Sequence, residues 1–67
     1  MKIILNNRPE EFDSDQLTVE EILKLKNYSF KMLVTKINGN IVKKDQYESA
    51  VVKDGDDVMI LHLISGG

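Results

Sequence analysis

The chain has 67 residues and a formal net charge of −2, from nine lysines and arginines against eleven acids. This length allows one small domain, near the lower limit at which a chain folds without disulfide or metal support. The chain has no cysteine, which excludes a disulfide framework, a thiolate nucleophile and a cysteine-based zinc site. The scattered basic residues leave no footprint for nucleic acid. We therefore expect residues 1–67 to form a single domain that binds no nucleic acid.

The amino-terminal apolar run is short. It covers residues 3–5, which makes it neither a signal peptide nor a membrane span, so we expect a cytoplasmic protein. The sequence starts at Met1 without a tag-like stretch, and we expect the chain to be complete.

A hairpin is predicted at the amino end. Asn6 and Asn7 tolerate positive φ, so residues 9–12 can pair back onto residues 3–5. Pro9 has no backbone donor and belongs at the start or outer edge of the second strand.

A helix is predicted to begin at Thr18. Thr18 and Glu21 form a capping box, in which each side chain accepts from the other residue's backbone donor. Apolar side chains at helical spacing, including Val19 and Ile22, form a stripe that should face a sheet. Asn27 is a plausible terminator, so the helix spans about nine residues.

A second hairpin is predicted in the middle of the chain. Residues 32–37 are strand-like, and Asn38-Gly39 supplies the two positive-φ residues of a type I′ turn before residues 40–42. Residues 43–47 are irregular or a short helical turn.

The last strand is predicted over residues 58–64, after a turn at residues 53–56. Its nearly complete apolar character suggests a central position beside the first strand and parallel to it. The order of hairpin, helix, hairpin, short irregular stretch and strand predicts an α+β fold of the β-grasp (ubiquitin-like) type. This fold has a five-stranded mixed sheet with one main helix packed on one face. Residues 64–67 are expected to form a flexible tail.

The sequence offers little for catalysis or metal binding. His62 is the only histidine, and no cysteine or acidic residue stands at an obvious metal-binding spacing from it in the sequence, which favours a side chain at the end of the sheet. The serines have no neighbouring base motif, and no glycine-rich phosphate loop is present. Asp54-Gly55-Asp56 lacks the remaining ligands of a calcium loop, which favours a turn. We expect this chain to contribute no catalytic residue and to bind no metal or cofactor.

One helix covers one face of a sheet, so the other face meets water or a partner. Strand alternation divides the apolar side chains of the first and last strands into two sets. In one arrangement the outward set is Ile4, Met59, Leu61 and Leu63. This set would form a docking patch for a partner protein. The alternatives are that the opposite set is outward, or that the patch is packed under a loop.

The sequence ends in Ser65-Gly66-Gly67, directly after the apolar run. Gly67 has no Cβ, which leaves its α-carboxylate unhindered, and Gly66 lets the backbone thread a narrow channel. This ending predicts a reactive carboxyl group. A frayed end or an expression scar is the alternative.

These features together resemble the ThiS/MoaD family of ubiquitin-like sulfur carriers. The features are the amino-terminal hairpin, the Thr18 helix, Ile37-Asn38-Gly39, Asp54-Gly55-Asp56 and the final Gly66-Gly67. The resemblance spans the whole chain. The length, residues 38–42 and the ending at residues 63–67 are most similar to the ThiS branch, which serves thiamin thiazole synthesis. The MoaD branch, the small subunit of molybdopterin synthase, is the close second.

The resemblance implies that Gly67 carries sulfur. An E1-class, ThiF-like adenylyltransferase would activate its carboxylate with MgATP, and sulfur would then replace one oxygen to give a thiocarboxylate. Gly66 and Ser65 would supply slenderness and reach. The family's hydrophobic contact face would correspond to Ile4, Met59 and Leu61. The other implied partners are a ThiG-like thiazole synthase and a sulfur donor such as a cysteine desulfurase, and no membrane is involved. We expect the free protein to be a monomer.

Alternatives of other kinds stay open. The sulfur acceptor could be molybdopterin or an amino-acid precursor instead of the thiazole. The protein could be a ubiquitin-like modifier joined to lysines through Gly67, or a binding module with an inert tail.

Overall fold

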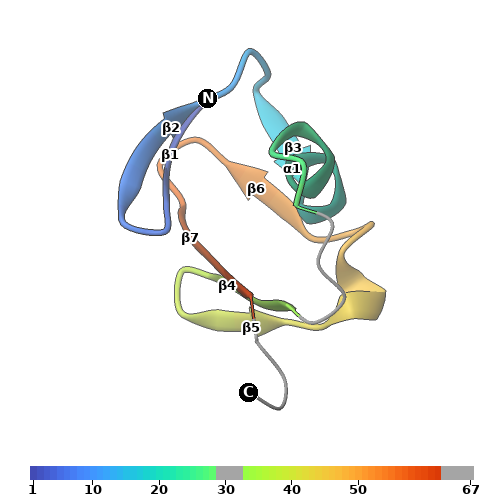
Figure 1. The fold of residues 1–67 in the computed structure, drawn as a ribbon. Helices are drawn as coiled ribbons and strands as arrows, with labels where there is room; N and C mark the ends of the chain where they lie inside the picture. The colour runs from blue at the N-terminus through green and yellow to red at the C-terminus, as the bar shows by residue number, and fades with distance from the viewer. Residues whose placement is uncertain (29–32, 63–67) are drawn as a thin grey trace.

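The structure, a computed structural model, describes residues 1–28 and 33–62 (Figure 1). The strands are β1 (Lys2–Leu5), β2 (Arg8–Glu11), β3 (Gln16–Thr18), β4 (Leu33–Ile37), β5 (Asn40–Val42), β6 (Val51–Lys53) and β7 (Asp57–His62). The helices are α1 (Val19–Leu25) and a single 3₁₀ turn, η1 (Lys44–Gln46). No helix in these described ranges is long and apolar enough to cross a membrane.

Five strands form the main sheet in the order β2-β1-β7-β4-β5. The β1–β7 pair is parallel and the other pairs are antiparallel, so the sheet is mixed. The predicted α+β fold is therefore confirmed, with the last strand in the centre and parallel to the first. The predicted strand ends at residues 32 and 63–64 lie outside the described residues.

Both predicted hairpin turns are present. Asn6 and Asn7 have φ of 52° and 66°, and Asn38 and Gly39 have φ of 51° and 84°. These left-handed conformations suit asparagine and glycine, and they turn the chain tightly enough for adjacent strands to pair.

The capping box starts α1 as predicted. The Thr18 backbone N–H donates to Glu21 Oε1 at 2.9 Å, and the Glu21 N–H donates to Thr18 Oγ1 at 3.2 Å. The next two N–H groups donate outside the helix, from Val19 to the Ala50 carbonyl and from Glu20 to the Tyr47 carbonyl, both at 3.0 Å. These bonds join the start of α1 to the segment that contains η1.

The helix ends in a Schellman motif centred on Asn27, which has φ of 57°. Its N–H donates to the Lys24 carbonyl at 3.2 Å, and the Tyr28 N–H donates to the Leu23 carbonyl at 2.8 Å. The predicted terminator is therefore confirmed. The helix itself has seven residues, and the predicted length of about nine corresponds to the helix with its two caps, Thr18 and Lys26.

A two-stranded sheet, β3 paired with β6, was not predicted. Leu17 lies across from Val52 in this sheet, and both side chains are buried. Three-residue strands with one inward side chain each are too short to show an alternating pattern, which is why the sequence signal missed them.

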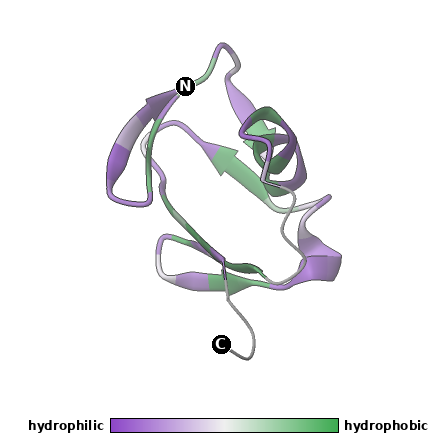
Figure 2. Cartoon of the chain, in the orientation of Figure 1, coloured by the Kyte–Doolittle hydropathy of each residue, from purple (hydrophilic) through white to green (hydrophobic). Residues whose placement is uncertain are grey.

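One core lies between the main sheet, α1 and the small sheet. Its buried side chains are Ile3, Leu5, Leu17, Val19, Ile22, Tyr47, Val52, Val58 and Ile60. The two strands of the first hairpin differ in hydropathy: β1 is mostly hydrophobic, and its edge neighbour β2 is hydrophilic (Figure 2). Within residues 1–28 and 33–62, the one polar side chain buried with this core is that of Thr35, which donates its hydroxyl to the Tyr47 hydroxyl at 3.1 Å. This bond satisfies a polar group that would otherwise be costly to bury.

An ion pair joins the end of α1 to the edge strand β2. Lys26 Nζ lies 2.8 Å from Glu10 Oε1. The hydrogen bond to Glu10 raises the pKa of Lys26 above its ordinary value. Because the shift is upward, the pair's small contribution to stability is lost as the pH rises through the folded-state pKa of Lys26.

The burial of Ile22 predicts how a substitution there changes the free energy of unfolding. Ile22 is 0% exposed and Ile41 is 66% exposed, so the same substitution tests both environments. We expect Ile22→Val to lower the free energy of unfolding by about 1 kcal/mol through lost packing. Ile41→Val should change it by less than about 0.5 kcal/mol. Urea denaturation measures both, and equal effects would contradict the assigned core.

Candidate functional site

The predicted reactive residues follow directly on β7. Gly67, Gly66, Ser65 and Leu63 lie outside the described residues, so their predicted roles stay predictions. The structure does describe the strand that leads to them and the sheet surface around it. These two features form the candidate site.

Strand β7 is paired on both sides. Its start pairs with β1, where Leu5 lies across from Val58, and the ladder with β4 continues to its end, where Leu33 lies across from His62. The ladder with β1 therefore covers only the first part of β7. The end of the strand is held by β4 and by a side chain from the first hairpin.

That side chain is Asn6. Its Oδ1 accepts from the Ile60 N–H at 2.7 Å, and its Nδ2 donates to the Ile60 carbonyl at 3.0 Å. Asn38, in the second hairpin, holds the start of β7 in a related way: its Oδ1 accepts from the Asp57 N–H at 2.9 Å, and its own N–H donates to the Asp57 carbonyl at 2.7 Å. The first residue of each hairpin turn thus hydrogen-bonds to the backbone of the central strand.

The face of the sheet opposite α1 carries the predicted outward set. Ile4 is 40% exposed and Leu61 is 47% exposed, while Met59, two residues before Leu61, is half-buried. The alternating side chains Val58 and Ile60 are buried against α1 and the small sheet. Of the two arrangements that strand alternation allowed, the structure therefore has the one with Ile4, Met59 and Leu61 outward.

Two further apolar side chains share this face and were missed in the sequence. Lys36 lies across from Met59 on one side and from Ile41 on the other, and Val34 lies across from Leu61. Directly paired residues lie on the same face of a sheet. The Asn38-Gly39 turn already implied the pairing of Lys36 with Ile41, so the hairpin register was a usable signal for Ile41. We call Ile4, Val34, Ile41, Met59 and Leu61 the outer apolar patch.

Charged side chains interrupt and border the outer apolar patch. Lys36 is exposed between Met59 and Ile41, and Asp57 is exposed across from Ile4. The patch therefore combines apolar side chains with isolated charges of both signs, which is typical of a protein-binding surface with a polar border.

The aspartates near the start of β7 serve a turn. Asp54 Oδ1 accepts from the Lys2 N–H at 2.7 Å, and Asp56 Oδ2 accepts from the Lys53 N–H at 2.9 Å. Gly55 between them has φ of 87°. The predicted turn is confirmed. Across residues 1–28 and 33–62, no three His, Cys, Asp or Glu side chains gather as they would around a metal ion.

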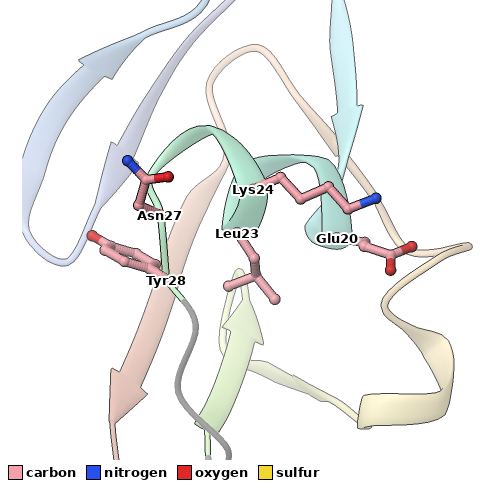
Figure 3. Close-up of a pocket in the computed structure, with 5 residues that line it drawn as sticks. All are labelled: Glu20, Leu23, Lys24, Asn27 and Tyr28. Atoms are coloured by element: carbon pink, nitrogen blue, oxygen red, sulfur yellow. The ribbon is translucent and has the colours of Figure 1, made fainter.

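A shallow hollow of about 390 Å³ lies along α1, the helix that covers the inner face of the sheet. Its lining residues are Glu20, Leu23, Lys24, Asn27 and Tyr28, drawn in Figure 3. The lining is open and mixes one acid with one base, and it offers no convergent set of polar groups for a small molecule.

Comparisons with known proteins agree with this geometry. The model of the ThiS family matches residues 3–67. The sulfur carrier protein ThiS of Escherichia coli (strain K12) is 30% identical over 67 residues, which cover 100% of both chains. A crystal structure of the thiamine biosynthesis protein ThiS from Geobacter metallireducens superposes with a TM-score of 0.86 at 30% identity, covering 100% of both chains. A solution structure of a thiamine biosynthesis protein from the same organism has a TM-score of 0.77 at 30% identity, over 100% of this chain and 88% of that one.

Leu61 and Ile60 are adjacent in β7 but differ in burial, so the same polar substitution should cost different amounts of stability at the two positions. Leu61→Ser should lower the free energy of unfolding by about 1 kcal/mol or less, because the residue is 47% exposed. Ile60→Ser should lower it by about 3 kcal/mol, through a cavity and a buried hydroxyl. Urea titration of both variants measures the difference. A cost for Leu61→Ser as large as that for Ile60→Ser would contradict the outward assignment.

Proposed function

The chain belongs to the ThiS family of sulfur carriers, and from that premise we propose that it carries sulfur on the Gly67 carboxylate for thiamine biosynthesis. The single observation that supports this most is the family match, which runs through Gly67. The E. coli and Geobacter relatives, named for sulfur transfer and thiamine biosynthesis, match over the whole chain.

The proposed chemistry has two steps. A carboxylate oxygen of Gly67 attacks the α-phosphorus of ATP, pyrophosphate leaves, and the carboxyl carbon becomes activated in an acyl adenylate. A sulfide equivalent then attacks that carbon, and AMP leaves with one of the original carboxylate oxygens. The product is a thiocarboxylate, a polarizable nucleophile. MgATP acts as a substrate of the partner enzyme.

This chain's part in the proposed chemistry is to present the tail. Gly66 and Gly67 have no Cβ, so a narrow active site can admit the backbone that carries the carboxylate. Partners of the ThiF-like adenylyltransferase and ThiG-like synthase types would supply the chemistry. A donor such as a cysteine desulfurase would supply the sulfur as a persulfide, and a thiol reductant would bring that sulfur to the sulfide level. The carrier itself contributes no catalytic group.

The outer apolar patch is the proposed docking surface for these partners. Exposed aliphatic side chains such as Leu61 and Ile4 lose water contact when a partner covers them, and this burial favours association. Leu61 is in β7 itself, so a partner bound at the patch would sit beside the strand that leads to Gly67. Leu63, in the same alternation, is proposed as a further contact.

The thiazole is proposed as the final acceptor, ahead of molybdopterin or an amino-acid precursor, because the relatives are thiamine biosynthesis proteins. A protein modifier would instead leave Gly67 in isopeptide bonds to lysines. The cytoplasmic location stays a prediction.

Thiocarboxylate formation is the direct test. We expect the protein, incubated with its adenylating enzyme, MgATP and a sulfur donor, to gain the mass difference between sulfur and oxygen at Gly67. Mass spectrometry of the intact protein and of its carboxyl-terminal peptide measures this gain. A variant with one alanine added after Gly67 is the control and should not react, since its terminal carboxylate is misplaced. An unchanged wild-type mass would overturn the proposed function, and conjugates to other proteins would favour the modifier alternative.

Substitution of an exposed apolar residue by glutamate tests the proposed docking surface. Leu61→Glu should raise the carrier concentration that gives half-maximal adenylation by about tenfold, because a charge replaces buried apolar area in the complex. Leu25→Glu is the matched control, since Leu25 is 60% exposed on α1, away from the outer apolar patch. Steady-state adenylation at varied carrier concentration measures both. Equal effects would remove the patch as the docking surface while leaving the carrier function intact.

A further inference from the structure

We propose that Asn6 is a positioning residue for the sulfur-carrying group: its side chain holds β7 at Ile60, so that the strand leading to the tail has a fixed position and direction. This inference rests on the proposed function, since a position matters only if a group on the tail reacts.

The contacts of Asn6 replace a missing piece of strand. The β1–β7 ladder ends where Leu5 lies across from Val58, because the chain turns at Asn6 with φ of 52°. The Asn6 N–H still donates to the Val58 carbonyl at 2.9 Å. Its side-chain amide then takes the place of the next peptide group, with an acceptor for the Ile60 N–H at 2.7 Å and a donor for the Ile60 carbonyl at 3.0 Å. The hydrogen bonds from the first hairpin to β7 therefore extend from Val58 to Ile60.

The position of Ile60 in the sheet makes these hydrogen bonds from Asn6 important. Thr35 of β4 lies across from Ile60 on the other side, so with the bonds from Asn6 the strand has a neighbour on both sides at this position. The side chains on either side of Ile60, Met59 and Leu61, belong to the outer apolar patch. The two bonds from Asn6 therefore fix the direction of β7 at the point where the proposed docking surface meets the strand leading to the tail. Strand ends held from one side fray more readily.

Asparagine meets the two requirements of this position, a left-handed φ and a side chain that can bond both backbone groups of Ile60. The left-handed φ of 52° is accessible to asparagine at small cost, and its amide carries an acceptor and donors at the spacing of a peptide group. The substitution Asn6→Asp would keep the acceptor for the Ile60 N–H. It would also put a negative oxygen against the Ile60 carbonyl, so the second bond would be lost.

The chain offers two matched controls, because Asn7 and Asn38 also have left-handed φ, of 66° and 51°. Glycine accepts such φ freely, so Asn→Gly removes each side chain without backbone strain. Asn7→Gly changes the same turn without touching β7. Asn38→Gly removes one side-chain bond to the other end of β7, at Asp57, and so controls for a general loss of stability.

The experiment compares the three glycine variants with the wild type in two assays. The first is hydrogen exchange of the Ile60 amide by NMR, which needs no partner. The second is ATP–pyrophosphate exchange with the E1-class adenylating enzyme from the same organism, at varied carrier concentration and at a temperature where all variants are folded. We expect Asn6→Gly to speed exchange at Ile60 and to lower kcat by about fivefold or more through misplacement of the carboxylate. Asn7→Gly and Asn38→Gly should keep the wild-type kcat.

The outcomes separate this inference from the proposed function. If the wild type supports no pyrophosphate exchange, the proposed function fails and the positioning role fails with it. If the wild type reacts and Asn6→Gly has the kcat of Asn38→Gly, Asn6 is only a structural residue and the inference alone is overturned. An unchanged Ile60 exchange rate in Asn6→Gly would also overturn it.

Discussion

Strand β7 is the single connection between the two halves of the main sheet. In the order β2-β1-β7-β4-β5, one hairpin lies on each side of β7, and neither hairpin pairs with the other. The β1–β7 pair joins residues from the two ends of the sequence, such as Leu5 and Val58. Such non-local pairing forms only after the loop-closure entropy has been overcome, so the sheet is complete only when β7 is in place. The core and the outer surface both depend on this step.

The register of β7 decides both faces at once. Because side chains alternate, a slip by one residue would bring Met59 and Leu61 into the core and put Val58 and Ile60 outside. Hydrophobicity alone resists this slip weakly, since both sets are aliphatic. The side-chain amides of Asn6 and Asn38 hydrogen-bond to particular backbone groups, those of Ile60 and Asp57, and a slipped strand would lose both sets of bonds. Polar groups in the turns therefore specify which apolar face is the core.

Much of this arrangement could be predicted from the sequence because its signals are local. The Thr18 capping box and the Asn38-Gly39 turn depend on neighbouring residues, and both are confirmed. The central place of β7 followed from its apolar character. The small β3–β6 sheet was missed because its strands are short, and the bonds from Asn6 to Ile60 were missed because they join residues distant in sequence. Single-sequence patterns contain no information on such pairings until the topology is known.

The outer apolar patch favours association of identical chains, and the charges within it oppose this association. Exposed aliphatic side chains on a sheet invite association of identical chains, and a lysine within such a surface opposes this association because burial would strip its water. Lys36 occupies that place between Met59 and Ile41. In the proposed function the carrier would serve several enzymes in turn and would have to leave each one, which favours a patch of modest area over a large obligate interface. A charge that opposes self-association also costs free energy when a partner covers it, so a partner bound at the proposed docking surface would need a polar or acidic group opposite Lys36.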